Sequence, residues 1–280
     1  MKSREERRYT DFNDDFAQTA KQDYALPEDY RFVRTDFGSR LLSALIYGAA
    51  LVFSAVYCRL VLHMRVRGCS CLRGAHDGFF IYGNHTQPFG DVFIPALCVF
   101  PRRIYTVVSP ANYGIPVIGK LLPLLGALPL IPSVHGYREL LRAMEQRLRA
   151  GHPIVLYPEA HVWEYYTGIR PFPEAAFGYP VKFDKPVFAM TTTYQKSKWF
   201  RRPRMTVWLD GPFVGEGENA KHKAASLHDA VYHTMLKRSK SSRQTGRMKK
   251  ALAMQVLFSW WGQRGSNPRP HACEACALTS

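Results

Sequence analysis

The stretch GFFIYGNHTQPFGDVFIPALCVF, residues 78–100, joins a strand, a polar loop and a helix. Its first part is apolar up to Gly83, which is typical of a strand buried on both faces, as in parallel sheets. The loop carries Asn84, His85 and Asp91. The segment after Asp91 predicts a helix with Pro95 in its first turn, so the Asp91 carboxylate is expected near the helix start. Such a strand–loop–helix unit is the building block of α/β folds.

The same alternation continues along the chain. Residues 137–151 place four apolar side chains on one face and end at Gly151, which predicts an amphipathic helix. Residues 115–132 are apolar but interrupted by prolines, which predicts a short helix, a turn and an extended segment. Further strands are predicted at 103–109, 152–159, 185–194 and 204–212. We therefore predict an α/β domain over 65–236, with a mostly parallel central sheet covered by helices on both sides.

A hydrophobic helix precedes this domain. Residues 41–58, LLSALIYGAALVFSAVYC, contain no charge and follow a polar N-terminal arm at 1–40. As a helix they would extend about 27 Å at about 1.5 Å per residue, near the lower limit of a membrane span. A membrane-associated helix over 41–64 is favoured by Tyr47, Tyr57 and the basic residues after the run. The excess of basic residues predicts that the domain after it, with any active site, lies on the cytoplasmic face. A buried core helix is the alternative, and the pattern fits both spanning and interfacial helices.

The C-terminal part, residues 237–280, is predicted to be a basic tail with an apolar segment. Residues 237–250 hold seven basic residues and no acid, and the apolar ALAMQVLFSWW follows. This combination suits an anionic membrane surface, although a solvated tail explains the basic residues equally well. Residues 262–280 show neither periodicity nor a core pattern. We interpret them as a reading-frame artefact and assign them no function.

Composition limits the classes of partner and site. The chain has 280 residues, 46% of them apolar, and a formal charge of 38 − 22 = +16. This charge favours anionic partners, but it does not distinguish nucleic acids, lipid head groups and phosphorylated substrates. The six cysteines have no zinc-type spacing, so we expect no metal site and a reducing compartment. No recognisable nucleic-acid module accompanies the charge, so no nucleic-acid partner is expected.

The loop after Gly83 has the residue types of an acid–base device. Ligands of open α/β folds bind at the carboxyl ends of the strands, where this loop lies. Asp91 can fold back onto one nitrogen of the His85 imidazole and leave the other free as a general base. The simpler alternative is that both residues are structural: His85 has a satisfied hydrogen bond, and Asp91 only caps the helix.

Four segments in order resemble the glycerolipid acyltransferase family, the 1-acylglycerol-3-phosphate acyltransferases and their relatives. NHTQPFGD (84–91) resembles its first motif, in which an Asn-His pair is followed by four residues and an Asp. LGALPLIP (125–132) resembles its second block, IVLYPEAH (154–161) its Phe-Pro-Glu-Gly-Thr-Arg block, and KPVFAM (185–190) its Val-Pro-Ile-Val-Pro-Val strand. The resemblance covers about residues 60–215.

This resemblance implies transfer of a fatty acyl group from acyl-CoA or acyl carrier protein to a hydroxyl of a lysophospholipid or related glycerolipid. His85 would be the general base, and Asp91 would orient it. The implied partners are membrane lipids and the acyl donor, which is a co-substrate, and no cofactor is implied. The residues expected to bind substrate are Asn84, Glu159, His161 and Arg170.

The chain also departs from the family pattern. Five residues rather than four separate His85 from Asp91, so one residue must bulge out near 88–90. Ala160, His161 and Val162 replace Gly-Thr-Arg, and Pro132-Ser133 stands where the second block often has an arginine. Arg170 or His161 could replace the missing phosphate-binding arginines, or the acceptor differs. A non-catalytic lipid-binding relative with the same fold is the alternative function.

Overall fold

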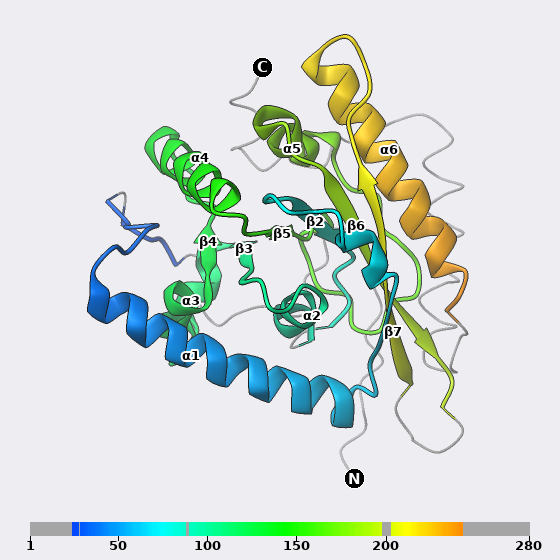
Figure 1. Cartoon of the computed structure of the whole chain (residues 1–280), viewed down its shortest axis with the longest axis horizontal. Helices are drawn as coiled ribbons and strands as arrows, with labels where there is room; N and C mark the ends of the chain where they lie inside the picture. The colour runs from blue at the N-terminus through cyan, green and yellow to red at the C-terminus, as the bar shows by residue number, and fades with distance from the viewer. Residues whose placement is uncertain (1–23, 28, 88–89, 198–202, 243–280) are drawn as a thin grey trace.

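A twisted sheet forms the centre of the protein in a computed structural model that describes residues 24–27, 29–87, 90–197 and 203–242. Within these residues the sheet has seven strands in the order β1-β7-β6-β2-β5-β3-β4 (Figure 1). The strands are β1 (Arg65–Arg67), β2 (Phe80–Gly83), β3 (Tyr105–Val108), β4 (Ala127–Pro129), β5 (Ile154–Leu156), β6 (Val187–Gln195) and β7 (Arg204–Phe213).

Helices cover both faces of this sheet. The α-helices are α1 (Phe37–Val56), α2 (Gly90–Cys98), α3 (Ile118–Leu125), α4 (Val134–Arg149), α5 (Gly178–Phe183) and α6 (Ala220–Ser239). A π-helical turn (Tyr57–Val61) continues α1, and short 3₁₀ helices lie at Cys69–Leu72, Pro110–Gly114 and Glu174–Phe177. In Figure 1, α4, α5 and α6 lie on one side of the sheet, and α1, α2 and α3 lie on the other.

The two faces follow from strand periodicity. In β2, Phe80 and Tyr82 pack into the cluster that contains residues of α4 and α6, whereas Ile81 packs into the cluster that contains residues of α2. In β6, Val187 packs into the first of these clusters and Phe188 into the second. Successive side chains of a strand point to opposite faces, so continuous apolar strands need a cover on both. The predicted fold class is therefore confirmed.

The direction of β7 departs from the main pattern. β2 pairs in parallel with β5 and β6, and β3 pairs in parallel with β5 and β4, but β6 and β7 are antiparallel. The reason is the short connection, because parallel neighbours need a crossover of roughly a dozen residues or more and only residues 196–203 lie between these strands. β1 pairs in parallel with β7 and was not predicted, since Arg65–Arg67 has no apolar pattern.

The proline-rich segment 115–132 folds as predicted. It forms the short helix α3, which ends at Gly126 in the left-handed conformation (φ 92°), and then β4. A Cβ on Gly126 would come within 2.7 Å of the carbonyl oxygen of Ile104, so both backbone angle and space require glycine here. Helix α2, by contrast, begins at Gly90, earlier than predicted, so Pro95 lies inside the helix rather than in its first turn.

Helix α1 begins at Phe37 because Asp36 caps it. The Asp36 carboxylate accepts the Ser39 N–H at 2.7 Å. Within the described residues, Phe37–Val61 is the one helical segment long and apolar enough to cross a membrane, judged by length and composition. Only 11% of its most apolar part is buried in the protein. The alternative of a buried core helix is therefore wrong.

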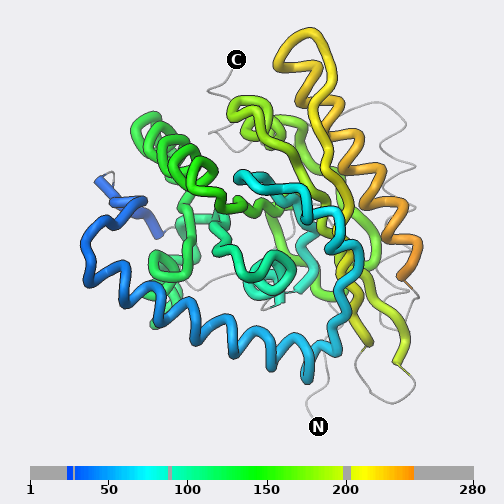
Figure 2. Tube along the Cα trace, in the orientation of Figure 1, coloured from blue at the N-terminus to red at the C-terminus, as the bar shows by residue number. Residues whose placement is uncertain are grey.

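Only one side of α1 contacts the domain. Ser43 donates its hydroxyl to the carbonyl of Leu124 at 2.6 Å, and the Tyr47 hydroxyl accepts the Ile104 N–H at 3.1 Å. Near the other end of the helix, the rings of Phe53 and Phe93 lie 5.5 Å apart. Helix α1 thus runs along α3 and α2 for most of its length (Figure 2).

Two predicted segments lie partly or wholly outside the described residues. These are most of the N-terminal arm (1–40) and nearly all of the tail (237–280), including residues 262–280. The predicted boundary at 236 falls inside α6, which continues to Ser239. The predicted bulge at 88–90 lies outside the description except for Gly90.

Candidate functional site

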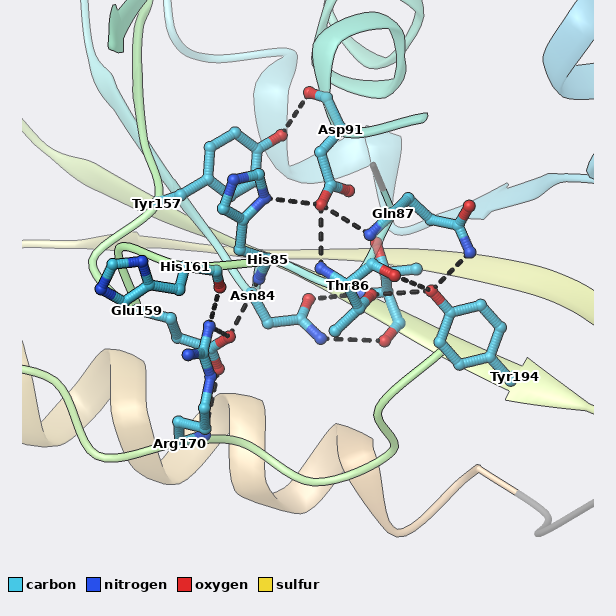
Figure 3. A network of polar contacts seen from close by, with 11 residues as sticks. Asn84, His85, Thr86, Gln87, Asp91, Tyr157, Glu159, His161, Arg170 and Tyr194 are labelled. Carbon is cyan, nitrogen blue, oxygen red and sulfur yellow. Dashed lines mark hydrogen bonds and ion pairs between the residues drawn. The ribbon is translucent and has the colours of Figure 1, made fainter. Parts of the chain in front are cut away.

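The candidate site lies at the carboxyl ends of β2 and β5. Chain segment 84–87 leaves β2, and residues 157–161 leave β5 beside it (Figure 3). Because these neighbouring strands are parallel, their loops emerge at the same edge of the sheet. His85 comes from the first loop, and Tyr157 and Glu159 come from the second. The topology thus brings together residues that are more than 70 positions apart in the sequence.

His85 and Asp91 are in direct contact. The Nδ1 atom of His85 lies 2.8 Å from Oδ2 of Asp91. The same Oδ2 accepts the backbone N–H groups of Thr86 at 2.8 Å and Gln87 at 2.9 Å. The Asp91 side chain is 1% exposed, whereas that of His85 is 21% exposed. A buried carboxylate with three N–H donors therefore fixes an imidazole that reaches the surface.

This geometry assigns roles to the two imidazole nitrogens. Since Oδ2 of Asp91 is an acceptor, the hydrogen-bond network assigns the proton of the neutral ring to Nδ1 of His85. Nε2 is then the basic nitrogen, with a lone pair available to a proton donor. An imidazole held in this tautomer by a carboxylate is suited to general-base catalysis.

Tyr157 holds the other side of the imidazole. Its ring stacks on that of His85, with centroids 4.5 Å apart and planes 20° apart. The ring occupies space left by Gly83, where a Cβ would come within 2.7 Å of the tyrosine Cε1 atom. The glycine that ends β2 is therefore required by the close approach of this ring. Tyr157 was not predicted as a site residue, although it directly precedes the Pro-Glu pair of the third block.

Asn84 has a position different from the one expected of a substrate-binding residue. Its side-chain oxygen accepts the Thr192 N–H at 2.7 Å, and its amide donates to the Thr192 carbonyl at 3.1 Å. The residue is buried. Its amide therefore ties the loop after β2 to the main chain of β6.

Glu159 and Arg170 form a buried ion pair behind the His85 main chain. Glu159 Oε2 accepts the His85 N–H at 3.0 Å and lies 3.2 Å from an Arg170 guanidinium nitrogen, while Oε1 accepts the Arg170 N–H at 3.0 Å. The guanidinium also donates to the carbonyl of His161 and lies 4.6 Å from the centroid of the Trp163 ring. Arg170 is only 1% exposed.

These contacts place Arg170 inside the wall of the site. The guanidinium contacts a carboxylate, a carbonyl and an indole ring, and it does not face the solvent, from which a phosphate would bind. His161 is partly exposed, and its imidazole lies beside the network and points away from the Asp91 carboxylate (Figure 3). The six predicted residues thus gather in one region, but they occupy different layers of it.

A second polar cluster supports the loop from β6. The Tyr194 hydroxyl lies 2.7 Å from Thr86 Oγ1 and accepts a hydrogen bond from Gln87 Nε2 at 2.9 Å. Burial raises the pKa of Tyr194 well above its ordinary value, with the Asp91 charge contributing, so the hydroxyl stays protonated. Tyr194 ends the strand predicted over 185–194, and nothing local in the sequence links it to residues 86 and 87.

The loop after β5 contains two unfavourable backbone angles, at Ala160 and at Tyr165 (φ +57°). Ala160 stands where the block that residues 154–161 resemble has a glycine, and its φ is +62°, in the left-handed region. This region costs an L-residue with a Cβ roughly 1–2 kcal/mol. The Ala160 N–H bonds the carbonyl of Tyr157 at 3.0 Å, so the turn is closed despite the unfavourable angle.

Two other features bear on ligands. A hollow of about 380 Å³, lined by residues that include Lys185, Phe188 and Lys223, lies at the amino end of β6, the opposite edge of the sheet from His85. Among the described residues, no three His, Cys, Asp or Glu side chains lie close enough together to hold a metal ion.

The fold has a known counterpart. The crystal structure of the 1-acyl-sn-glycerophosphate (LPA) acyltransferase PlsC from Thermotoga maritima is similar to it, with a TM-score of 0.50 and 15% sequence identity. The match covers 76% of this chain and 87% of that chain. No family model and no curated protein matches the sequence. The likeness therefore concerns the fold, which this chain shares with a lipid acyltransferase.

Replacement of Arg170 by methionine should destabilise the fold. Breaking a buried ion pair leaves an uncompensated charge and costs about 3–5 kcal/mol in free energy of unfolding. Urea unfolding followed by circular dichroism measures this loss. Arg149→Ala is the matched control, since Arg149 lies 2.6 Å from Glu145 but is exposed, and such pairs contribute about 0.3–0.5 kcal/mol. Unchanged stability with a higher KM for a phosphorylated acceptor would instead favour the substrate-binding role predicted from the sequence.

Ala160→Gly should stabilise the protein. Glycine removes the cost of the left-handed angle but adds conformational entropy to the unfolded chain, which leaves a net gain of about 1 kcal/mol. The same urea titration measures the shift of the midpoint. A lower midpoint in the glycine variant would contradict the left-handed conformation at this position.

Proposed function

We propose that this chain is an acyltransferase that moves a fatty acyl group from acyl-CoA or acyl carrier protein to a hydroxyl of a lysophospholipid or related glycerolipid. The observation that carries the proposal is the 2.8 Å contact between His85 Nδ1 and Asp91 Oδ2 in a loop at the carboxyl edge of the sheet. The fold likeness to a lipid acyltransferase and the four ordered sequence blocks support it. No cofactor besides the acyl donor is part of the proposal.

In the proposed reaction His85 acts on the acceptor. Nε2 takes the proton of the acceptor hydroxyl while its oxygen attacks the thioester carbonyl carbon. The carbon–sulfur bond then breaks, and the departing thiolate takes the proton from the imidazolium. The thiol leaves, and His85 is again neutral beside the Asp91 carboxylate. Asp91 stabilises the imidazolium while it exists. General-base assistance of this kind is worth about 10²- to 10⁴-fold in rate.

The proposal names a broad class of acyl acceptor because Arg170 is buried and does not face a bound phosphate. Arg170 is one of two residues, with His161, that could replace the missing phosphate-binding arginines, and it is paired with Glu159 in the interior. Among the residues predicted to bind substrate, His161 is partly exposed, which supports it as the substrate contact. Asn84 and Glu159 then act by holding the loop that carries His85.

We further propose that α1 associates with a membrane on the cytoplasmic side and lies in its surface plane. Because α1 rests on α2 and α3 along its length, an upright helix would carry these elements into the bilayer. Its outward side chains form an apolar row: Leu41, Leu45, Val52 and Val56. Exposed Arg40 and Arg59 bracket the row, as suits an anionic surface.

His85→Ala should lower kcat by about 10²- to 10⁴-fold, because the hydroxyl loses its proton acceptor. Thioester consumption by purified protein, with acyl-CoA or acyl-carrier-protein donors and a panel of lyso-lipids, measures the effect. His228→Ala is the matched control, since His228 also pairs with an aspartate (Nδ1 to Asp229 Oδ1, 3.0 Å) but lies on α6. Equal activity in the two variants would rule out the proposed base.

The same assay distinguishes the alternative function. A non-catalytic lipid-binding relative would consume no thioester with any acceptor and would bind lipid vesicles equally well with and without His85. The observation that favours this alternative is the burial of Arg170, which is not available to bind a phosphate.

Val52→Gln should weaken vesicle binding about tenfold, because burial of a valine side chain in an apolar phase contributes about 1.5 kcal/mol. Sedimentation with vesicles of mixed zwitterionic and anionic lipid measures the affinity. Val214→Gln is the control, since Val214 is 67% exposed, close to the 69% of Val52, but follows β7. If both variants bind as the unmodified chain does, α1 is not the membrane-binding surface.

A further inference from the structure

The carbonyl group of Asp91 lacks its normal helical partner. In an α-helix this oxygen would accept the N–H of the residue four positions later. That residue is Pro95, which has no N–H, although α2 continues through it to Cys98. A buried carbonyl without a donor is unfavourable, so the first turn of α2 needs a hydrogen bond from outside the helix.

Tyr157 supplies this hydrogen bond. Its hydroxyl donates to the Asp91 carbonyl oxygen at 2.6 Å, from the loop that follows β5. Burial raises the pKa of Tyr157 well above its ordinary value, and the nearby Asp91 charge adds to this, so the hydroxyl remains a donor. The contact joins β5 to the helix turn that carries the Asp91 carboxylate.

The same side chain also contacts the partner of Asp91. The Tyr157 ring stacks on the imidazole at a centroid distance of 4.5 Å, while its hydroxyl reaches past the ring to the Asp91 main chain (Figure 3). One residue thus limits both rotation of the His85 ring and displacement of the Asp91 turn. The loop between these residues is one residue longer than in the family motif, so this external support acts on a longer span.

We propose that Tyr157 is a positioning residue for the His85–Asp91 pair, with its hydroxyl replacing the helical hydrogen bond that Pro95 removes. The effect on rate rests on the proposed acyl transfer, whereas the effect on the geometry of the pair does not. Tyr157 stands where the Phe-Pro-Glu-Gly-Thr-Arg block that residues 154–161 resemble begins with phenylalanine, which has no hydroxyl.

Tyr157→Phe keeps the ring and removes the hydroxyl. We expect kcat to fall about tenfold with little change in KM, because a small displacement of the base impairs chemistry more than binding. The second readout is the tautomer of His85 in protein labelled with ¹⁵N-histidine, with its signals assigned by their loss in His85→Ala. The unmodified chain should show the Nδ1–H tautomer alone, and Tyr157→Phe should show a mixture of both.

A second substitution tests the cause. In Tyr157→Phe/Pro95→Ala, the new N–H at residue 95 can bond the Asp91 carbonyl, so kcat and the single tautomer should return toward those of the unmodified chain. Tyr82→Phe is the matched control, because Tyr82 is buried and its hydroxyl also donates to a main-chain carbonyl, that of Ala176 at 2.6 Å, away from Asp91. It should change neither readout, and thermal unfolding of each variant separates loss of fold from loss of position.

The proposal is overturned if Tyr157→Phe keeps a single His85 tautomer, or if Pro95→Ala restores neither readout in a folded double variant. Failure of the acyltransferase proposal looks different. In that case the unmodified chain consumes no thioester with any acceptor, yet the tautomer mixture still appears in Tyr157→Phe and disappears in the double variant.

Discussion

The site depends on one buried carboxylate oxygen, Oδ2 of Asp91, which accepts three N–H groups. Two come from the main chain of the loop after β2, and the third comes from the His85 ring. A buried charge is tolerated only where such donors surround it. The carboxylate therefore constrains two parts of the chain. The loop after β2 must point its N–H groups at Asp91, and α2 must begin where its first turn places Asp91 beside that loop. The orientation of the imidazole is a consequence of satisfying that charge.

A second carboxylate completes the support of His85 from the opposite side. Glu159 accepts the main-chain N–H of His85, while Asp91 accepts from its ring. The first contact fixes where the residue sits, and the second fixes how its side chain is turned. Arg170 is bonded to Glu159 through both its main chain and its guanidinium, so the cation neutralises the buried acid. Two acids of similar burial thus serve different purposes, because one faces a titratable ring and the other an arginine.

The parts of this arrangement that could be predicted from sequence are those with local spacing. His85 and Asp91 are close along the chain and flank a helix start, so their contact could be anticipated from the loop alone. The apolar strands likewise predicted a mostly parallel sheet. The position of Arg170 could not be predicted, because the sequence alone does not distinguish an arginine that binds a phosphate from one that is buried against a glutamate. Tyr157 and Tyr194 act across strands, and their roles appear only once β2, β5 and β6 are side by side.

The hydrogen bond between Asn84 and Thr192 also affects the order in which the protein can fold. It spans 108 positions of the chain, and the bond from His85 to Glu159 spans 74. Contacts this distant in sequence require closure of long loops, which is slow compared with forming local helices. The loop that carries the imidazole can therefore be completed only after β5 and β6 have both joined β2. A nascent chain that has not yet emerged past residue 192 has the residues of the pair but not the environment that aligns them.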